Sequence, residues 1–379
     1  MEQPIIEFQQ EDNGILKFTI SSIDVSFVNA LRRTILSDIP IIVFKTSPYE
    51  LNKCNISFNS TRLNNEIIKH RLSNIPIHIK DLNINLEDYI LEIDEENNSD
   101  TIIMITTENF KIKNLKTNTY LSDNDIKRIF PPYIPPSGQG EYYIDFVRLN
   151  PRLSDTIPGE KLKLTCGLSI GTAREDGAFN VVGTCSYGCS PNIDKINEEV
   201  EIRKEKWSKE GKNKEEVEFE AKNWKLLEGM RYVIKNSFDF IIETIGIYEN
   251  NELVIIACNI LIEKLINLKN ITNNDELEIN ESNTTMENCY DIKLLNEDYT
   301  IGNMLNYVIY EIYYKKMDLL NYVGFKKLHP HDNFSIIRIG FNNEETKERI
   351  REMFINSMDK AIEVIEKIKM MFEGTPERK

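Results

Sequence analysis

The sequence predicts an α+β fold in which one strand–helix module occurs twice and a mainly β segment interrupts the first copy. Residues 16–35 and 290–309 share one pattern, an alternating apolar strand followed by a capped helix. Residues 48–160 alternate short apolar runs with Asn- and Asp-rich turns, which is typical of β structure. The chain closes on a long amphipathic helix at about 344–372.

The repeat is an ungapped alignment with the shared pattern D-x-[ST]-x-x-N-x-L-x-x-x-I. The matched positions are Asp24 with Asp298, Ser26 with Thr300, Asn29 with Asn303, Leu31 with Leu305 and Ile35 with Ile309. We interpret the Ser or Thr as the helix N-cap and the Asp as a charge near the positive helix end, although Asp24 is also a suitable cap. The alternative to duplication is a chance match between two segments that each contain a strand and a capped helix.

Two such modules predict an intramolecular pseudo-twofold pair that forms through the apolar stripes of the two helices. The predicted pairing residues are Val28, Leu31, Ile35, Leu305 and Ile309. Arg32 and Arg33 flank this stripe and have no counterparts in the second copy, which carries Asn306 and Tyr307. We therefore expect both arginines to contact something outside the pair.

The predicted domain organisation follows from this repeat. The first module comprises 1–47 and 161–268 with a charged helical insertion near 194–235, the inserted β-rich domain is 48–160, a linker is 269–289, and the second module is 290–379. Residues 269–289 are polar and predict a linker or a long exposed loop. The charged insertion predicts a solvated helix, with a partner-binding helix as the alternative.

Composition limits the possible function classes. The net charge of −15 gives no general attraction to nucleic acid, so such a role requires a local basic patch or other subunits. The six cysteines are scattered, which favours a reducing compartment over a disulfide framework. The longest apolar run, 253–262, is too short to span a bilayer, and the N-terminus lacks a signal-peptide pattern. We expect a soluble intracellular chain without a membrane partner.

The sequence offers no constellation for catalysis, and we expect no cofactor and no metal. It contains no phosphate-binding G-x-x-x-x-G-K-[ST] loop and no G-x-S-x-G nucleophile motif. Cys185 and Cys189 have a loose spacing without a second ligand pair nearby. His329 and His331 in "HPHD" are candidates for ligands or a general base, but a turn is the favoured interpretation.

Several motifs resemble one family. "VNALRRTILSDIP" (28–40) resembles the signature helix of the alpha-like subunits of multisubunit DNA-directed RNA polymerase, namely bacterial alpha, the archaeal D subunit and the third subunit of polymerase II. "NNEIIKHRLSNIPI" (64–77) is similar to the second signature of the D-like branch. "GTAREDGAFNVV" (171–182) looks like the segment that returns from the inserted domain to the dimerisation domain.

The C-terminal part resembles the small partner of that subunit, the archaeal L or eleventh polymerase II subunit. The similar stretches are 296–309, with Gly302 and Asn303 in the expected pattern, and 323–341, with the His329–Pro330 turn. A single fused chain of this kind is similar to those of large nucleocytoplasmic DNA viruses, and a cellular origin stays open. For a virus, the resemblance implies the host cytoplasm, in a viral factory, and packaging in the virion as a further option.

The resemblance implies a non-catalytic assembly platform in transcription. Its expected partners are the largest and second-largest polymerase subunits and small subunits, with DNA reached only through the complex. The residues carried over as large-subunit docking residues are Asn29, Arg32, Arg33, His70 and Arg71. Some D-like subunits bind zinc or an iron–sulfur cluster in the insertion, but 48–160 holds only Cys54. The alternative function is an independent interaction module or transcription regulator that reuses the fold.

Overall fold

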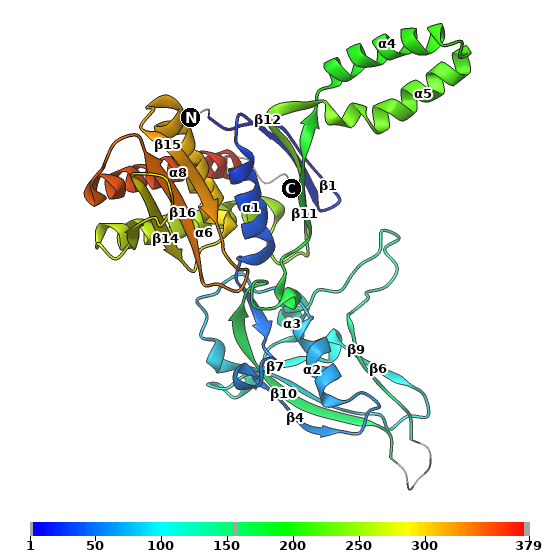
Figure 1. Ribbon diagram of the computed structural model, residues 1–379. Helices are drawn as coiled ribbons and strands as arrows, with labels where there is room; N and C mark the ends of the chain where they lie inside the picture. The colour runs from blue at the N-terminus through cyan, green and yellow to red at the C-terminus, as the bar shows by residue number, and fades with distance from the viewer. Residues whose placement is uncertain (1–2, 153, 155, 157, 375–379) are drawn as a thin grey trace. The chain divides into compact units, whose positions relative to one another are not determined.

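The structure is a computed structural model that describes residues 3–152, 154, 156 and 158–374. The chain, traced from blue to red in Figure 1, forms two compact units. Unit 1 consists of the residues up to 35 together with 184–243 and those from 250 onward, and unit 2 consists of 36–183 and 244–249. Unit 1 therefore collects segments from both ends and from the middle of the sequence.

The first sheet of unit 1 has four strands in the order β1-β2-β12-β11. These strands are β1 (Ile5–Asp12), β2 (Ile15–Ser21), β12 (Val233–Thr244) and β11 (Val182–Pro191). The alternation predicted for 14–20 is confirmed, because Leu16, Phe18 and Ile20 are all buried on one face of β2. The Phe18 ring stacks on Phe240 of β12 at a centroid distance of 4.8 Å. The buried face of this sheet thus contributes the stacked aromatic rings of Phe18 and Phe240 to the core of unit 1.

The second sheet of unit 1 also has four strands, in the order β13-β14-β16-β15, and each neighbouring pair is antiparallel. The strands are β13 (Ile279–Glu281), β14 (Cys289–Leu295), β16 (Phe334–Phe341) and β15 (Leu320–Lys326). The strands expected at "YDIKLL" and "FSIIRIGF" correspond to β14 and β16, so both predictions are confirmed. Asp291 of β14 lies directly opposite Arg338 of β16 in this register.

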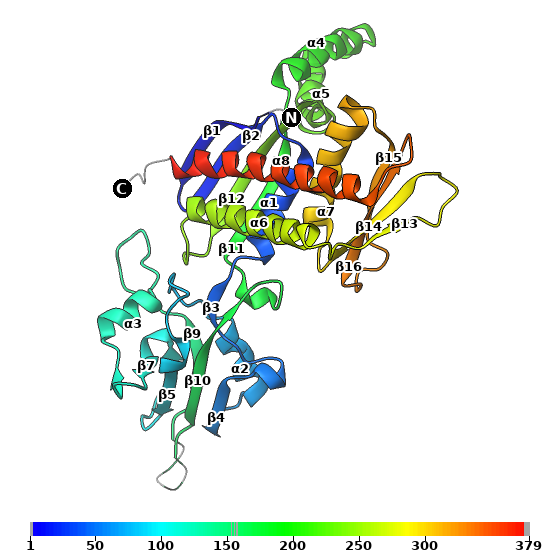
Figure 2. The same cartoon turned by 90° about the vertical axis from the view of Figure 1, so that its left-hand side faces the viewer.

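The principal helices of unit 1 are α1 (Val25–Ser37), α6 (Asn250–Asn273), α7 (Tyr299–Ile309), which continues as a π-helical segment (Tyr310–Lys316), and α8 (Lys347–Glu373). Figure 2 shows α6 and α8 side by side across both sheets. The ring of Phe372, near the end of α8, meets the ring of Phe18 in the first sheet edge to face, with the ring centroids 5.1 Å apart. Helix α8 also contacts α7. The predicted apolar face of the last helix is confirmed as buried, at Ile350, Phe354, Met358, Ala361, Ile365, Ile368 and Phe372.

The charged insertion forms a hairpin of two helices, α4 (Ile193–Lys209) and α5 (Lys214–Leu226), which extends from the ends of β11 and β12 in Figure 1. The chain reverses at Gly211, whose φ of +91° is a conformation that suits glycine. Ile196 and Val200 pack with Trp224 in a small core of their own. The guanidinium of Arg203 lies 4.6 Å from the Trp224 ring centroid.

Unit 2 is built on a six-stranded sheet with the path β3-β10-β5-β7-β8 and with β4 paired to β10. The strands are β3 (Ile41–Phe44), β4 (Cys54–Asn59), β5 (Tyr89–Glu96), β7 (Lys111–Asn114), β8 (Thr119–Tyr120) and β10 (Lys161–Gly171). A separate ladder joins β6 (Ile103–Thr106) to β9 (Asp145–Leu149), and the helices are α2 (Asn65–Ser73) and α3 (Asp123–Ile129). The aromatic rings of Phe110, Phe130 and Phe146 meet edge to face in the core.

The polar stretch 269–289 is more ordered than the predicted loop or linker, and that prediction is wrong for part of it. Helix α6 continues to Asn273, and β13 forms an edge strand on β14. The side chain of Thr272 is buried and its hydroxyl donates to the carbonyl of Leu268 at 2.8 Å. Leu277 and Ile279 are also buried, so this segment packs on the rest of unit 1.

The remaining structure consists of short turns and of long segments without regular elements. The 3₁₀ turns are Tyr49–Leu51, Leu86–Asp88, Thr107–Asn109, Gly177–Phe179 and Gly229–Arg231. The Pro- and Gly-rich stretch 130–143 forms no helix or strand, as predicted, and contains one bridge between Tyr133 and Tyr142. No helix in the described part of the chain combines the length and the apolar character that crossing a membrane requires.

Candidate functional site

The first turns of α1 and α7 have the same capping geometry. Asp24 Oδ1 accepts a hydrogen bond from the backbone N–H of Ser26 at 2.8 Å. Asp298 Oδ1 accepts the equivalent bond from the N–H of Thr300 at 2.9 Å. The aspartate therefore caps each helix, and the interpretation that Ser or Thr is the cap is wrong. The carboxylate is placed to reach the second amide of the helix, so the hydroxyl two residues later lies inside the first turn.

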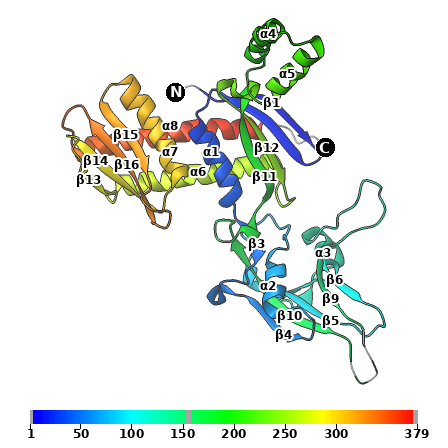
Figure 3. The ribbon, with the colours of Figure 1, turned by 45° about the vertical axis from the view of Figure 1, so that its right-hand side comes forward.

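The two helices run antiparallel where they meet. Near one end, the ring of Phe27 in α1 contacts that of Tyr307 in α7 edge-on, with centroids 6.2 Å apart. Near the other end, the side chain of Arg33 in α1 reaches the first turn of α7. Figure 3 draws the two helices next to each other. The side chains predicted to form the pairing stripes are all buried: Val28, Leu31, Ile35, Leu305 and Ile309.

Arg33 binds the capped end of α7 through two donors. Its Nε donates to Thr300 Oγ1 at 2.9 Å, and its Nη2 donates to Asp298 Oδ2 at 2.9 Å. The Arg33 side chain is 34% exposed and that of Asp298 is 18% exposed, so the ion pair is partly shielded from water. The expectation that neither arginine joins the two segments is therefore wrong for Arg33, because its guanidinium fork matches a carboxylate and a hydroxyl on the other helix.

Arg32 has a different environment. Its Nε and Nη2 both donate to Asn29 Oδ1, at 3.1 and 2.9 Å, one turn back along α1. Among the residues that the structure describes, no carboxylate forms an ion pair with Arg32. The side chain is half-buried, and the amide of Asn29 holds it in one orientation. Asn29 and Arg32 together thus present a positioned cation that no described carboxylate of unit 1 neutralises by an ion pair.

A cavity of about 340 Å³ lies beside this pair, and we call it the interhelix cavity. Its wall includes Asp24 and Asn29 from the start of α1, Asn303 and Asn306 from α7, and Tyr187 from β11. Ser26 Oγ and Asn306 Oδ1 are buried and have no hydrogen-bond partner in the described part of the chain. Burial raises the pKa of the Tyr187 phenol, and the positive charge of Arg32 opposes this shift. The cavity is therefore lined by both polar and aromatic side chains, which come from α1, α7 and β11.

His70 and Arg71, the other predicted docking residues, belong to α2 in unit 2. Asn64 caps this helix by accepting from the N–H of Ile67 at 2.9 Å. Both side chains are exposed, and Arg71 Nη2 donates to the carbonyl of Asp145 at 3.0 Å. They lie on a shallow cavity of about 340 Å³. The predicted docking residues therefore form two sets, one in each unit.

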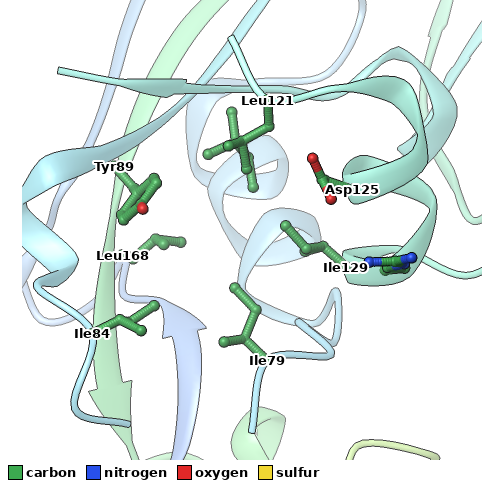
Figure 4. Close-up of a pocket in the computed structure, with 9 residues that line it drawn as sticks. Ile79, Ile84, Tyr89, Leu121, Asp125, Ile129 and Leu168 are labelled. Atoms are coloured by element: carbon green, nitrogen blue, oxygen red, sulfur yellow. The ribbon is translucent and has the colours of Figure 1, made fainter. Parts of the chain in front are cut away.

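Sequence reasoning missed an apolar cavity of about 280 Å³ in unit 2 (Figure 4). Ile79, Ile84, Tyr89, Leu121 and Leu168 line it, with Asp125 from α3 at its edge. No local pattern signals this cavity, because its lining comes from loops and strands that are far apart in the sequence.

The cysteines and histidines that were considered for metal or acid–base chemistry do not form a shared site in the described part of the chain. Burial raises the pKa of the Cys185 thiol to about 12, and Cys189 on the same strand is exposed. The turn predicted at "HPHD" is confirmed, since Asp332 Oδ2 accepts from the His329 N–H at 3.0 Å. Within the described ranges, no three His, Cys, Asp or Glu side chains gather as metal ligands do.

Comparison with known proteins adds independent information. Residues 17–265 match the RNA polymerase Rpb3/Rpb11 dimerisation domain. The DNA-directed RNA polymerase subunit Rpo3 of Methanosphaera stadtmanae is 25% identical over 297 residues, which cover 72% of this chain and 99% of the relative. The DNA-directed RNA polymerase II subunit rpb3 of Dictyostelium discoideum is 26% identical over 214 residues, or 54% of this chain and 65% of the relative.

A shorter match is closer in sequence. The subunit Rpo3 of Thermococcus kodakarensis is 42% identical over 62 residues, which cover 16% of this chain and 21% of the relative. The family match takes in β2, α1 and most of α6, together with all of unit 2. The chain thus belongs to the RNA polymerase Rpb3/Rpb11 dimerisation-domain family and is homologous to the Rpo3 and Rpb3 subunits of DNA-directed RNA polymerase.

Proposed function

We propose that this chain is a non-catalytic assembly subunit of a multisubunit DNA-directed RNA polymerase and docks the two large catalytic subunits. The observation that carries the proposal is the contact between α1, which lies inside the family match, and α7, which lies beyond it. A family named for dimerisation needs a partner domain, and residues 290–379 supply a helix with the same cap and the same motif.

The proposal includes a fusion of two modules in one chain. Each module contributes a four-stranded sheet and a capped helix, and the helices meet in antiparallel orientation. An antiparallel contact between equivalent helices is what a twofold axis between two copies produces. A covalent link replaces the association step of two chains, so the pair forms at a high effective concentration.

Docking is assigned first to Arg32 and Asn29. An arginine that is already oriented and not neutralised loses less side-chain entropy when it binds a carboxylate on a partner. Arg33 is not assigned as a primary docking residue, because its guanidinium already binds Asp298 and Thr300. His70 and Arg71 remain candidates for a second contact made by unit 2.

The test is capture of the large subunits from the native source by the tagged chain, with the eluate assayed for template-dependent RNA synthesis. We expect two large polypeptides and activity in the eluate. A chain that elutes alone and inactive contradicts the proposal and favours an independent interaction module or transcription regulator with the same fold.

The Arg32→Ala substitution sharpens this test. We expect it to weaken capture about tenfold or more, because interface arginines are frequent hot spots, while the free energy of unfolding changes by about 0.5 kcal/mol or less. Arg231→Ala is the matched control, since the Arg231 side chain is 77% exposed and forms an ion pair with Glu228 three residues earlier. Equal capture by both variants contradicts the assignment of Arg32.

A further inference from the structure

Two cysteines of unit 2 face each other across neighbouring strands. In the antiparallel ladder between β4 and β10, Cys54 is the direct partner of Cys166. Both thiols are free, and the two residues are buried, with exposed fractions of 3% and 0%. Cys166 lies 112 positions after Cys54 in the sequence, so only the fold brings the two sulfur atoms together.

The position of this pair in the ladder suits a covalent bond between the two side chains. The N–H of Gly167 donates to the carbonyl of Lys53 at 3.2 Å, so the hydrogen-bonded pair of residues is the one next to the cysteines. Cys54 and Cys166 therefore form a non-hydrogen-bonded pair, in which the Cα atoms are about 4.5 Å apart and the side chains lie closest. Disulfides span Cα distances of about 4.4–6.8 Å, so the strands need no large movement to be joined.

The surroundings make the two thiols unequal. The hydrogen bond with Cys166 lowers the pKa of the Cys54 thiol against the opposing effect of burial, and the positive charge of Lys69 in α2 lowers it further. The same hydrogen bond, together with burial, raises the pKa of Cys166. The thiolate is the form that reacts with oxidants, so Cys54 reacts first and Cys166 is the thiol that resolves the product.

We propose that Cys54 and Cys166 are a reversible oxidation site, at which a peroxide converts the two thiols to a disulfide that joins β4 to β10. The Cys54 thiolate attacks one peroxide oxygen and breaks the O–O bond, which gives a sulfenic acid on Cys54 and hydroxide, and the hydroxide takes up the proton that Cys54 lost. Cys166 then attacks the Cys54 sulfur, and its proton leaves with the hydroxyl group as water. In sum, two thiols and one hydrogen peroxide give one disulfide and two water molecules. A low-molecular-weight thiol reverses the bond by exchange.

The disulfide closes a loop that contains most of unit 2. A disulfide stabilises a protein mainly by restricting the unfolded chain, and it does so more strongly for a long loop. Ile68 and Leu72 of α2 pack in the same core as the two cysteines, so the bond stabilises the base on which α2 rests. We expect the oxidised chain to melt about 4 °C or more above the reduced chain. This proposal does not depend on the proposed function.

The first test uses the full chain with Cys189→Ser, which removes an exposed thiol able to link one chain to another and leaves five of the six cysteines. The folded protein is treated with hydrogen peroxide, its remaining thiols are alkylated in urea, and the digest is analysed by mass spectrometry. We expect three free thiols and one linked pair of peptides, which carry Cys54 and Cys166. Dithiothreitol should restore all five thiols. Absence of this linked pair, or an equal yield when the chain is oxidised in urea, overturns the proposal.

The second test separates the roles of the two thiols. In Cys166→Ala the sulfenic acid has no resolving thiol, so dimedone should label Cys54, whereas in Cys54→Ala it should label Cys166 about tenfold less. Cys258→Ala is the control, since this buried cysteine belongs to α6, and it should keep both the linked peptides and the rise in melting temperature. Stronger labelling of Cys166 than of Cys54 contradicts the order of the steps, and a linked chain that melts no higher than the reduced chain contradicts the stabilising role.

Discussion

Arg32 and Arg33 are neighbours in the sequence, but they point to different partners on the helix surface. Successive residues of an α-helix are about 100° apart, so one side chain turns toward α7 while the next turns toward Asn29. Arg33 then contributes to the contact between α1 and α7, whereas the Arg32 side chain bonds only within α1 among the described residues. The stability of the isolated chain should therefore depend on Arg33 and not on Arg32.

The Arg33→Ala substitution should lower the free energy of unfolding by about 1 kcal/mol, since it removes a partly exposed ion pair and a hydrogen bond. Chemical denaturation of the isolated chain measures this change. Arg32→Ala serves as the control from the same helix. A larger loss for Arg32→Ala than for Arg33→Ala contradicts the assignment of the two side chains.

The ion pair between Asp291 and Arg338 should make the stability of the chain depend on pH in the acid range. Arg338 Nε and Nη2 donate to the two carboxylate oxygens at 2.6 and 2.7 Å, across β14 and β16. These bonds hold the pKa of Asp291 below its ordinary value of 3.8. A carboxylate with a lowered pKa stabilises the fold fully above its ordinary pKa, and this contribution is lost as the pH falls through the lowered value.

The melting temperature of the wild type should therefore fall more steeply below about pH 4 than that of Asp291→Asn. Above about pH 5 the wild type should be the more stable protein, because only the charged side chain pairs fully with Arg338. Melting curves from pH 2 to pH 7 measure both effects. Parallel curves for the two proteins over this range contradict the role given to the ion pair.

Gly302 allows α7 to pack closely on β15. A Cβ atom at this position would lie 1.9 Å from Cε2 of the Phe325 ring, which is far inside van der Waals contact. Gly302→Ala should therefore cost about 1–3 kcal/mol of unfolding free energy, as overpacked cores do. Gly188→Ala in β11 is the control, because a Cβ there meets nothing within 4 Å. Equal stability of the two variants implies that the Phe325 ring moves aside freely.

Elements with a strong local period could be predicted from the sequence, and irregular ones could not. The alternation of 14–20, the stripe of 26–39 and the long face of 344–372 are each contained in one segment, so β2, α1 and α8 were predictable. β15 contains Asn321 and Gly324, which break an apolar alternation, and β13 is only three residues long. These strands are stabilised mainly by pairing with β16 and β14, a tertiary effect.

The candidate site was predictable in its residue types but not in its contacts. The repeat aligned Asp24 with Asp298 and Ser26 with Thr300, and both aspartates have the same role in the structure. The partner of Arg33 was not predictable, because Asp298 lies 265 positions further along the chain. The cavity that Tyr187 lines also arises only when α1, α7 and β11 come together.

Taken as a whole, the chain belongs to the family through residues 17–265, and we propose that its C-terminal part supplies a second copy of the module. The matched region ends at residue 265, within α6, and the structure continues this helix beside α8. Helices α6 and α8 lie across both four-stranded sheets of unit 1 (Figure 2). We therefore propose that one polypeptide provides both members of the dimerisation pair in the assembled enzyme.

The most direct test of this claim is the copy number and position of the chain in the purified native polymerase, determined by cryo-electron microscopy. The account predicts one copy, with residues 16–37 and 290–309 in contact within the same chain and with Arg32 at an interface with a large subunit. Two copies that pair with each other, or a separate small subunit at the place of residues 290–379, would contradict it.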